Sequence, residues 1–154
     1  HINAIKYRSV DDRVAVTEQL ARSEGATLPA NLMMTSTEVK AMRKAGMQIG
    51  AHTVSHPILA RLTDEQALQE IGNSKQFLEN LLGERIGLFA YPNGKPSEDY
   101  SPQTVEVVRS LGFDAAVSTT WGASCQGDDM LQIKRFTPWD KTQFRFGLRL
   151  LRNF

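Results

Sequence analysis

The stretch Met47–Asp64, MQIGAHTVSHPILARLTD, holds two of the three histidines of this 154-residue chain. His52 and His56 are separated by three residues and follow an apolar run. Pro57 comes directly after His56. The β-branched residues between them and the following proline disfavour a continuous helix. We therefore expect a buried strand that ends in a tight loop and brings both imidazoles to one point.

Neutral imidazole is a good ligand for zinc and similar divalent cations, and a pair supplies half of a four-coordinate shell. A zinc-protease motif would need a glutamate after the first histidine, whereas Thr53 follows His52. The alternative is that one histidine caps a helix and the other is a surface group. For a bare H-x-x-x-H pattern that alternative is the more common explanation, so the neighbouring elements must decide.

Helical and strand-like patterns alternate along the chain. They predict helices over about 9–23, 36–45, 64–82, 102–110 and 140–151, and strands within 47–52, 86–92, 113–119 and 130–136. This alternation is typical of an α/β fold with parallel strands and outer helices, here in a single domain over residues 1–154. Loops at the carboxyl ends of such strands build active sites. The histidine loop and the turn Tyr91–Gly94, YPNG, should therefore share one rim.

Composition excludes several classes of protein. A net charge of +1 gives no long-range field for nucleic acid, although 36–47, STEVKAMRKAGM, superficially resembles a recognition helix. Cys125 is the only cysteine, so neither an intrachain disulfide nor a cysteine-rich zinc site can form. No segment approaches the roughly 20 apolar residues of a membrane span. We expect no nucleic-acid partner.

The tail 140–154 places three arginines on one helical stripe beside an apolar stripe. A basic amphipathic helix of this kind can lie on a membrane surface. Gly147 weakens an isolated helix, which favours a terminal helix packed on the domain. We do not expect contact with a membrane surface.

Residues 50–57, GAHTVSHP, resemble the second motif of the polysaccharide deacetylases, the nodulation-protein-B homology family, in which H-[ST]-x-x-x-H or H-[ST]-x-x-H precedes a proline. Residues 88–94, LFAYPNG, resemble the third motif, an aromatic-Pro-x-Gly loop after a strand. The likeness covers about 35–117. It implies a partial, distorted (β/α) barrel and a metal-dependent hydrolase of carbon–nitrogen non-peptide bonds. The implied substrate is a polysaccharide or cell-envelope glycan that loses acetyl groups, chiefly N-acetyl.

The resemblance also implies roles for individual residues. His52 and His56 would bind a divalent metal, with zinc expected and cobalt or nickel as alternatives. The metal would polarise the acetyl carbonyl and lower the pKa of its bound water. The backbone N–H of Tyr91 would stabilise the oxyanion, and Pro92 and Asn93 would contact substrate. The alternative for the YPNG segment alone is an ordinary turn.

Two tryptophans, Trp121 and Trp139, could stack on sugar rings, and we assign Trp139 to substrate binding. The alternative for each is a partly buried core position. Arg135 either orients a catalytic carboxylate or is a surface cation.

Two motifs of the family have no match in this chain. The Thr-Phe-Asp-Asp-Gly segment, which supplies the base and the aspartate ligand, is missing, and Asp11–Asp12 suits a helix start better. Asp128, Asp129 and Asp140 are the remaining candidates for the acidic ligand. The late Leu-x-His, which supplies the general acid, is also missing.

We therefore expect the carboxyl-terminal part of a longer deacetylase domain that lacks its first strands. Its open sheet edge could pair with a second copy in a homodimer. The alternative is a catalytically incomplete carbohydrate-binding relic of the same fold.

Overall fold

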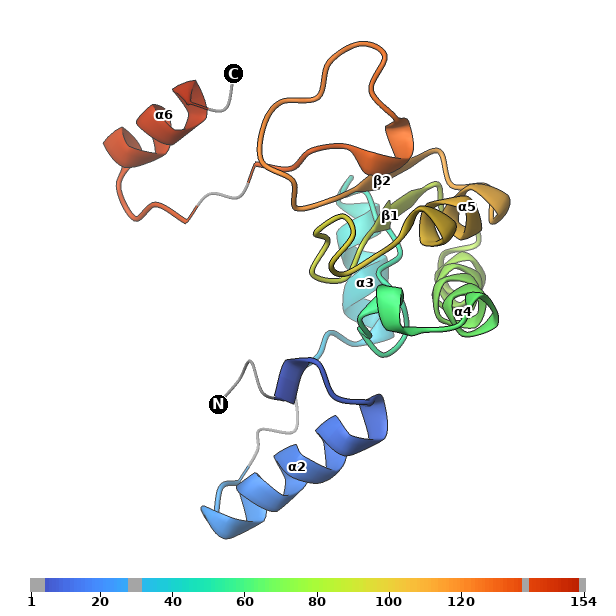
Figure 1. Cartoon of the computed structure of the whole chain (residues 1–154), viewed down its shortest axis with the longest axis vertical. Coiled ribbons are helices and arrows are strands. Elements are labelled where there is room, and N and C mark those ends of the chain that lie inside the picture. The colour runs from blue at the N-terminus through green and yellow to red at the C-terminus, as the bar shows by residue number, and fades with distance from the viewer. Residues whose placement is uncertain (1–4, 28–31, 137–138, 153–154) are drawn as a thin grey trace. The chain divides into compact units, whose positions relative to one another are not determined.

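The computed structural model describes residues 5–27, 32–136 and 139–152 (Figure 1). The chain divides into two compact units, His1–Gln48 and Ile49–Phe154. The second unit contains the sheet, both histidine-motif residues and the YPNG turn, so it positions the candidate site.

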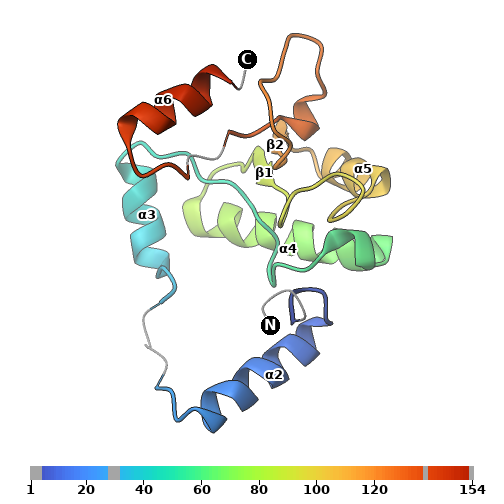
Figure 2. The ribbon, with the colours of Figure 1, turned by 60° about the vertical axis from the view of Figure 1, so that its left-hand side comes forward.

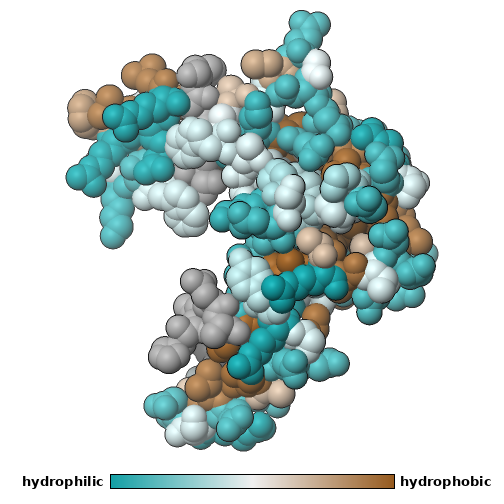
Figure 3. Space-filling view, viewed as in Figure 1, coloured by the Kyte–Doolittle hydropathy of each residue, from teal (hydrophilic) through white to brown (hydrophobic). Residues whose placement is uncertain are grey.

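The described part of the first unit includes the helices α2 (Val10–Ser23) and α3 (Ser36–Lys44). The Ser9 hydroxyl accepts from the Asp12 N–H at 3.1 Å, which places Asp11 and Asp12 in the first turn of α2 and supports their role as a helix start. Thr35 caps α3. Neither helix has a buried residue, and apolar side chains of α2 are exposed at the surface (Figure 3).

The second unit is built on two short parallel strands, β1 (Leu88–Ala90) and β2 (Ala115–Val117), with Phe89 opposite Ala116. Single bridges extend this sheet on both sides, from Ala51 to Phe89 and from Ile133 to Val117. A parallel pair requires a crossover, which α5 (Pro102–Ser110) provides. The predicted α/β layout with parallel strands is thus confirmed.

Two helices cover one side of the sheet, α4 (Asp64–Leu82) and α5 (Figures 1 and 2). Thr63 and Gln66 form a capping box at the start of α4, and Gly83 at φ 69° ends the helix in the left-handed region. Ser101 caps α5, whose first residue is proline. These boundaries agree with the sequence prediction.

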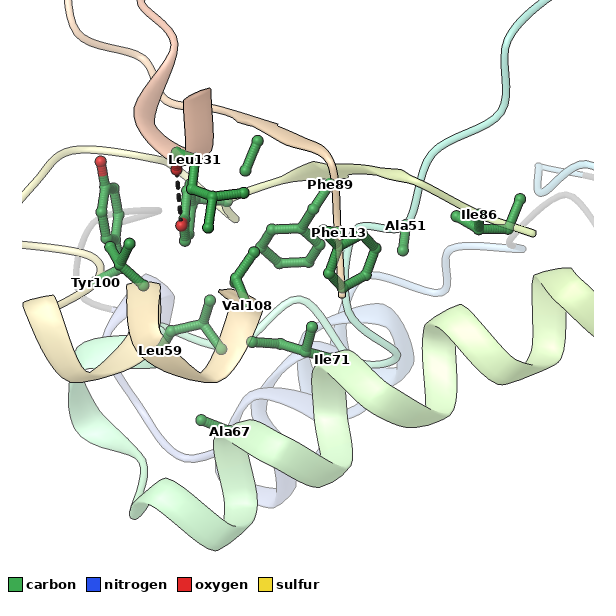
Figure 4. Packing of buried hydrophobic residues seen from close by; sticks show 13 residues of the cluster. Ala51, Leu59, Ala67, Ile71, Ile86, Phe89, Tyr100, Val108, Phe113 and Leu131 are labelled. Atoms are coloured by element: carbon green, nitrogen blue, oxygen red, sulfur yellow. Dashed lines mark hydrogen bonds between the residues drawn. The ribbon is translucent and has the colours of Figure 1, made fainter. Parts of the chain in front are cut away.

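The hydrophobic core lies between the sheet and these helices. In Figure 4 the rings of Phe89 and Phe113 lie side by side, 5.3 Å between centroids, facing Ile71 and Val108. Ala51 belongs to the same cluster, so the segment that precedes His52 is anchored in the core. The full cluster is Ala51, Leu59, Ala67, Ile71, Ile86, Phe89, Tyr91, Tyr100, Val105, Val108, Phe113, Ala116 and Leu131.

Two predicted strands are much shorter than expected. Segment 47–52 pairs with β1 only at Ala51, and 130–136 forms the 3-10 helix η2 (Met130–Gln132) before one bridge at Ile133. The Asp129 carboxylate accepts from the Leu131 N–H at 2.9 Å and so caps η2. A second short 3-10 helix, η1 (Leu59–Arg61), was not predicted.

The last helix, α6 (Gln143–Leu151), begins later than predicted because Thr142 caps it. It has no buried residue, and Phe144 and Leu151 are strongly exposed. Its Phe146 ring lies 5.6 Å from that of Phe136. Over the residues that the structure describes, every helix is too short or too polar to cross a lipid bilayer.

Candidate functional site

The histidine loop begins directly beside β1. The Ala51 N–H donates to the Leu88 carbonyl at 2.8 Å, and the Ala51 carbonyl accepts from the Ala90 N–H at 3.0 Å. His52 follows, and its Nδ1 lies 2.6 Å from the Ala90 carbonyl oxygen. Since Ala90 precedes Tyr91, the two motifs lie at the same rim of the sheet, as the sequence predicts.

The contact with Ala90 determines the tautomer of His52. A carbonyl oxygen can only accept, so a hydrogen bond there requires the proton on Nδ1. The lone pair then resides on Nε2, at the opposite side of the ring. An imidazole that donates one N–H to a carbonyl and offers the other nitrogen is the usual arrangement of a metal-binding histidine.

The two imidazoles lie close together. The ring centroids of His52 and His56 are 4.9 Å apart, with the planes at 76°. Two imidazoles bound to one tetrahedral zinc have centroids about 5 Å apart, from the Zn–N length and the tetrahedral angle. The centroid spacing of the pair is therefore the one expected for two imidazoles on one metal ion.

The loop between the histidines has an unfavourable backbone conformation. Thr53 has φ 66° and His56 has φ 54°, both in the left-handed region although neither is glycine. Such residues cost of order 1–3 kcal/mol each and persist only where surrounding contacts support them. Within the loop, the Thr53 hydroxyl accepts from the His56 N–H at 3.2 Å.

Support from outside the loop comes from Glu70 of α4, a residue that the sequence analysis missed. Its carboxylate accepts from the N–H groups of Val54 and Ser55, both at 2.9 Å, and from the Ser55 hydroxyl at 2.8 Å. The position of Glu70 in the sequence did contain a signal for this role. Glu70 is one helical turn from buried Ala67 and adjacent to buried Ile71, so its carboxylate lies next to the apolar face of α4 and requires partners.

The side chain of Tyr91 is structural. It is buried, its hydroxyl donates to the Leu131 carbonyl at 2.9 Å, and its ring stacks on Tyr100 at 3.9 Å (the dashed line in Figure 4 marks the hydrogen bond). Desolvation by burial raises the pKa of this phenol above its ordinary value. The side chain is therefore neutral and fixed at neutral pH.

The backbone N–H of Tyr91, the predicted oxyanion donor, already donates to the Val117 carbonyl at 3.2 Å. The bond continues the ladder between β1 and β2, so Tyr91 could serve an oxyanion only if this bond opened. Pro92 has no N–H. The first backbone N–H after this ladder bond therefore belongs to Asn93.

The YPNG turn is tied to the segment after β2. The Asn93 carbonyl accepts from the Thr119 hydroxyl at 2.8 Å, and the Gly94 carbonyl accepts from the Thr119 N–H at 2.8 Å. Gly94 has φ +80°, and a Cβ there would lie 3.0 Å from the Thr119 nitrogen and 3.1 Å from the Tyr91 oxygen. Only glycine fits this position without movement of the backbone.

We expect Gly94→Ala to lower the free energy of unfolding by more than about 1–2 kcal/mol, because both the left-handed φ and the backbone contacts oppose a side chain. Gly127→Ala is the matched control, since Gly127 also has a positive φ but nothing within 4 Å of the added Cβ. Urea denaturation of both variants measures the difference. Equal losses would show that the close approach of Thr119 does not constrain the turn.

The three carboxylates suggested as a third metal ligand are engaged elsewhere. Asp140 pairs with Arg149 through both oxygens, and this hydrogen-bonded cation lowers the Asp140 pKa. Asp129 caps η2, and Asp128 accepts from the Cys125 N–H. Within 5–27, 32–136 and 139–152, no three His, Cys, Asp or Glu side chains are grouped so that they could hold a metal ion. A metal ion held by the histidine pair would therefore need a further ligand from elsewhere.

The tryptophans are not core residues. Trp121 is half-exposed. It lines a pocket of about 410 Å³ together with Asp140 and the arginines of α6. One of these arginines, Arg149, lies over the Trp121 ring. Trp139 is 77% exposed. The core alternative therefore fails for Trp139, while its role in substrate binding stays a prediction. Arg135 donates its backbone N–H to the Thr120 carbonyl at 3.2 Å.

The chain is similar in sequence to known polysaccharide deacetylases. The family model for polysaccharide deacetylase matches residues 10–116. YxkH of Bacillus subtilis, whose assignment as a polysaccharide deacetylase is itself provisional, is 28% identical over 102 residues, which is 66% of this chain and 35% of YxkH.

Solved structures show the same architecture. The Streptococcus pyogenes deacetylase PplD, in complex with acetate, is 26% identical, with a TM-score of 0.64 over 70% of this chain and 46% of PplD. IcaB from Ammonifex degensii, at 20% identity, has a TM-score of 0.65 over 84% of this chain and 57% of IcaB, which supports the fold alone. This chain spans less than half of YxkH and of PplD.

The predicted fold class, a partial (β/α) barrel of the deacetylase type, is confirmed by these structures. The family model covers most of the chain and includes both motifs on which the resemblance was based. The chain belongs to the polysaccharide deacetylase family.

Proposed function

We propose that this chain forms the histidine-bearing part of a metal-dependent deacetylase that removes acetyl groups, chiefly N-acetyl, from a polysaccharide or cell-envelope glycan. The observation that supports this most strongly is the pair His52 and His56, whose ring centroids are 4.9 Å apart. His52 is also hydrogen-bonded to Ala90, the strand residue that precedes the YPNG turn. Hydrolysis breaks the amide C–N bond, adds water, and releases acetate and a free amine on the sugar.

In this proposal His52 and His56 hold a divalent cation, with zinc the preferred ion and cobalt or nickel as alternatives. When bound, the cation supplies Lewis acidity toward the acetyl carbonyl. The Nδ1–H of His52 stays on the Ala90 carbonyl and keeps the ring oriented.

The backbone of the turn supplies the oxyanion donor. We assign this role to the Asn93 N–H in preference to that of Tyr91, because the latter is held by Val117. Asn93 borders the acetyl group, and Trp139 offers an exposed face for a sugar ring. Pro92 is itself buried, so its contribution is to shape the turn.

The acidic ligand and the general base are expected from chain outside the described residues. A homodimer through the sheet edge stays a prediction, and the segments at Ala51 and Ile133, each paired at one residue, are the edges available for it.

The test is release of acetate from N-acetylglucosamine oligomers by the protein in its full natural length, with zinc, cobalt or nickel added after chelation. We expect acetate to appear only in the presence of metal. Acetate release that persists in excess chelator would contradict metal dependence, and inactivity with every acetylated glycan tested would contradict the proposed activity.

The second candidate is a carbohydrate-binding relic of the same fold. It is favoured by one observation, that among the described residues no acidic side chain is grouped with the two histidines so that the three could hold a metal ion. Glycan binding without acetate release in the same assay would support it.

A further inference from the structure

Glu70 occupies a position that the proposed activity does not explain. It lies on α4, and the loop that its carboxylate contacts is 15–16 residues earlier in the chain. Neighbouring Ala67 and Ile71 are buried in the core, at 3% and 0% exposure, so this part of the helix is firmly fixed. Glu70 therefore links the core to the histidine loop.

The hydrogen bonds of Glu70 converge on the centre of that loop. One oxygen accepts from two successive N–H groups, those of Val54 and Ser55, and the other accepts from the Ser55 hydroxyl. Bonds to an ionised carboxylate are roughly twice as strong as neutral ones. These bonds hold Val54 and Ser55. The residues on either side of that pair, Thr53 and His56, are the ones with positive φ.

With this arrangement, the carboxylate compensates for the unfavourable backbone of the loop. Without it, Thr53 and His56 could relax toward ordinary φ values, which would turn the His56 ring away from His52. Glu70 is unsuited to be a metal ligand itself, because both of its oxygens already accept hydrogen bonds from the loop.

We propose that Glu70 is the positioning residue of the metal site: it holds the His52–His56 loop in its left-handed conformation, so that the imidazoles converge before metal binds. The inference rests on the proposed function, since it assigns Glu70 to the same site. Preorganised ligands lose less conformational freedom on binding, so Glu70 contributes to metal affinity without contact with the metal.

The test measures the Zn²⁺ affinity of the protein in its full natural length by competition with a chromophoric chelator. We expect Glu70→Ala to weaken binding about 10–100-fold, the range found when residues that orient metal ligands are removed. Glu79→Ala is the matched control, because Glu79 is also on α4 and accepts a backbone N–H, that of Ile86 at 3.0 Å, in a different loop. This control should bind zinc within about twofold of the unchanged chain.

Glu70→Gln provides the conservative variant. Its amide oxygen can still accept from the two N–H groups, and its NH₂ can donate to the Ser55 hydroxyl, so most of the affinity should return. If Glu70→Ala is poorly folded, the comparison between Glu70→Gln and the unchanged chain decides instead. Because Glu70→Gln should still hold the loop, the two zinc affinities should differ by less than tenfold. A larger loss would overturn the proposal.

A second measurement does not depend on metal. In the metal-free chain, hydrogen exchange at the Val54 and Ser55 amides should accelerate at least tenfold in Glu70→Ala and stay unchanged in Glu79→Ala. Unchanged exchange, or equal zinc affinity of Glu70→Ala and the unchanged chain, would overturn the role of Glu70. Failure of the unchanged chain to bind zinc would instead contradict the proposed function, and the exchange rates would still decide whether Glu70 holds the loop.

Discussion

Replacement of His52 by asparagine is expected to lower Zn²⁺ affinity at least 100-fold while the fold is retained. The asparagine Nδ2–H can replace the His52 Nδ1–H as donor to the Ala90 carbonyl, which lies 2.6 Å from the ring nitrogen. Asparagine has no counterpart of the imidazole Nε2, so the metal loses a ligand. The variant thus separates the hydrogen bond from the coordination.

His52→Ala and His56→Ala complete the series. His52→Ala removes the ligand together with the bond to Ala90, and we expect the same loss of zinc affinity with an added loss of stability of about 1 kcal/mol. Zinc affinity is measured by competition and stability by urea denaturation. If His52→Asn binds zinc as tightly as the unchanged chain, the pair is not a metal site and the proposed function fails with it.

Much of the fold could be predicted from local sequence signals. Thr63, Gln66 and Gly83 define α4, and Ser101 with Pro102 define the start of α5, because caps act over three or four residues and are visible in sequence. Strand lengths were less predictable. The apolar segment 130–136 has the composition of a strand, but the carboxylate of Asp129 closes a 3-10 turn at its start.

The proximity of the two histidines was predictable from the sequence, and the residue that supports their loop was less so. His52 and His56 carry a spacing pattern, and their proximity to the YPNG turn follows from parallel strands that share a rim. Glu70 was missed because its partners are 15–16 residues away in the sequence, and its place beside the apolar face of α4 indicates only that it needs partners, not which ones. The use of the Tyr91 N–H in the ladder depends on register, and register is a tertiary property.

The largest expected effect on stability comes from Phe89→Ala. The Phe89 ring is 2% exposed and lies 5.1 Å from the Tyr91 ring and 5.3 Å from the Phe113 ring. Truncation of a buried phenylalanine typically costs about 3–5 kcal/mol, from lost transfer free energy and from the cavity that remains. Phe77→Ala is the control, because Phe77 on α4 is 61% exposed and should cost under about 1 kcal/mol.

The same variant should also weaken zinc binding, because Phe89 is at the centre of the strand that positions both motifs. Its backbone is opposite Ala51 on one side and Ala116 on the other, so movement of β1 displaces the Ala90 carbonyl that orients His52. We expect Phe89→Ala to reduce both the free energy of unfolding and the zinc affinity, and Phe77→Ala to leave both nearly unchanged. Urea denaturation and zinc competition on the two variants measure this. A loss of stability with zinc affinity intact would mean that the histidine loop is held by Glu70 and its own turn, independently of the strand beside it.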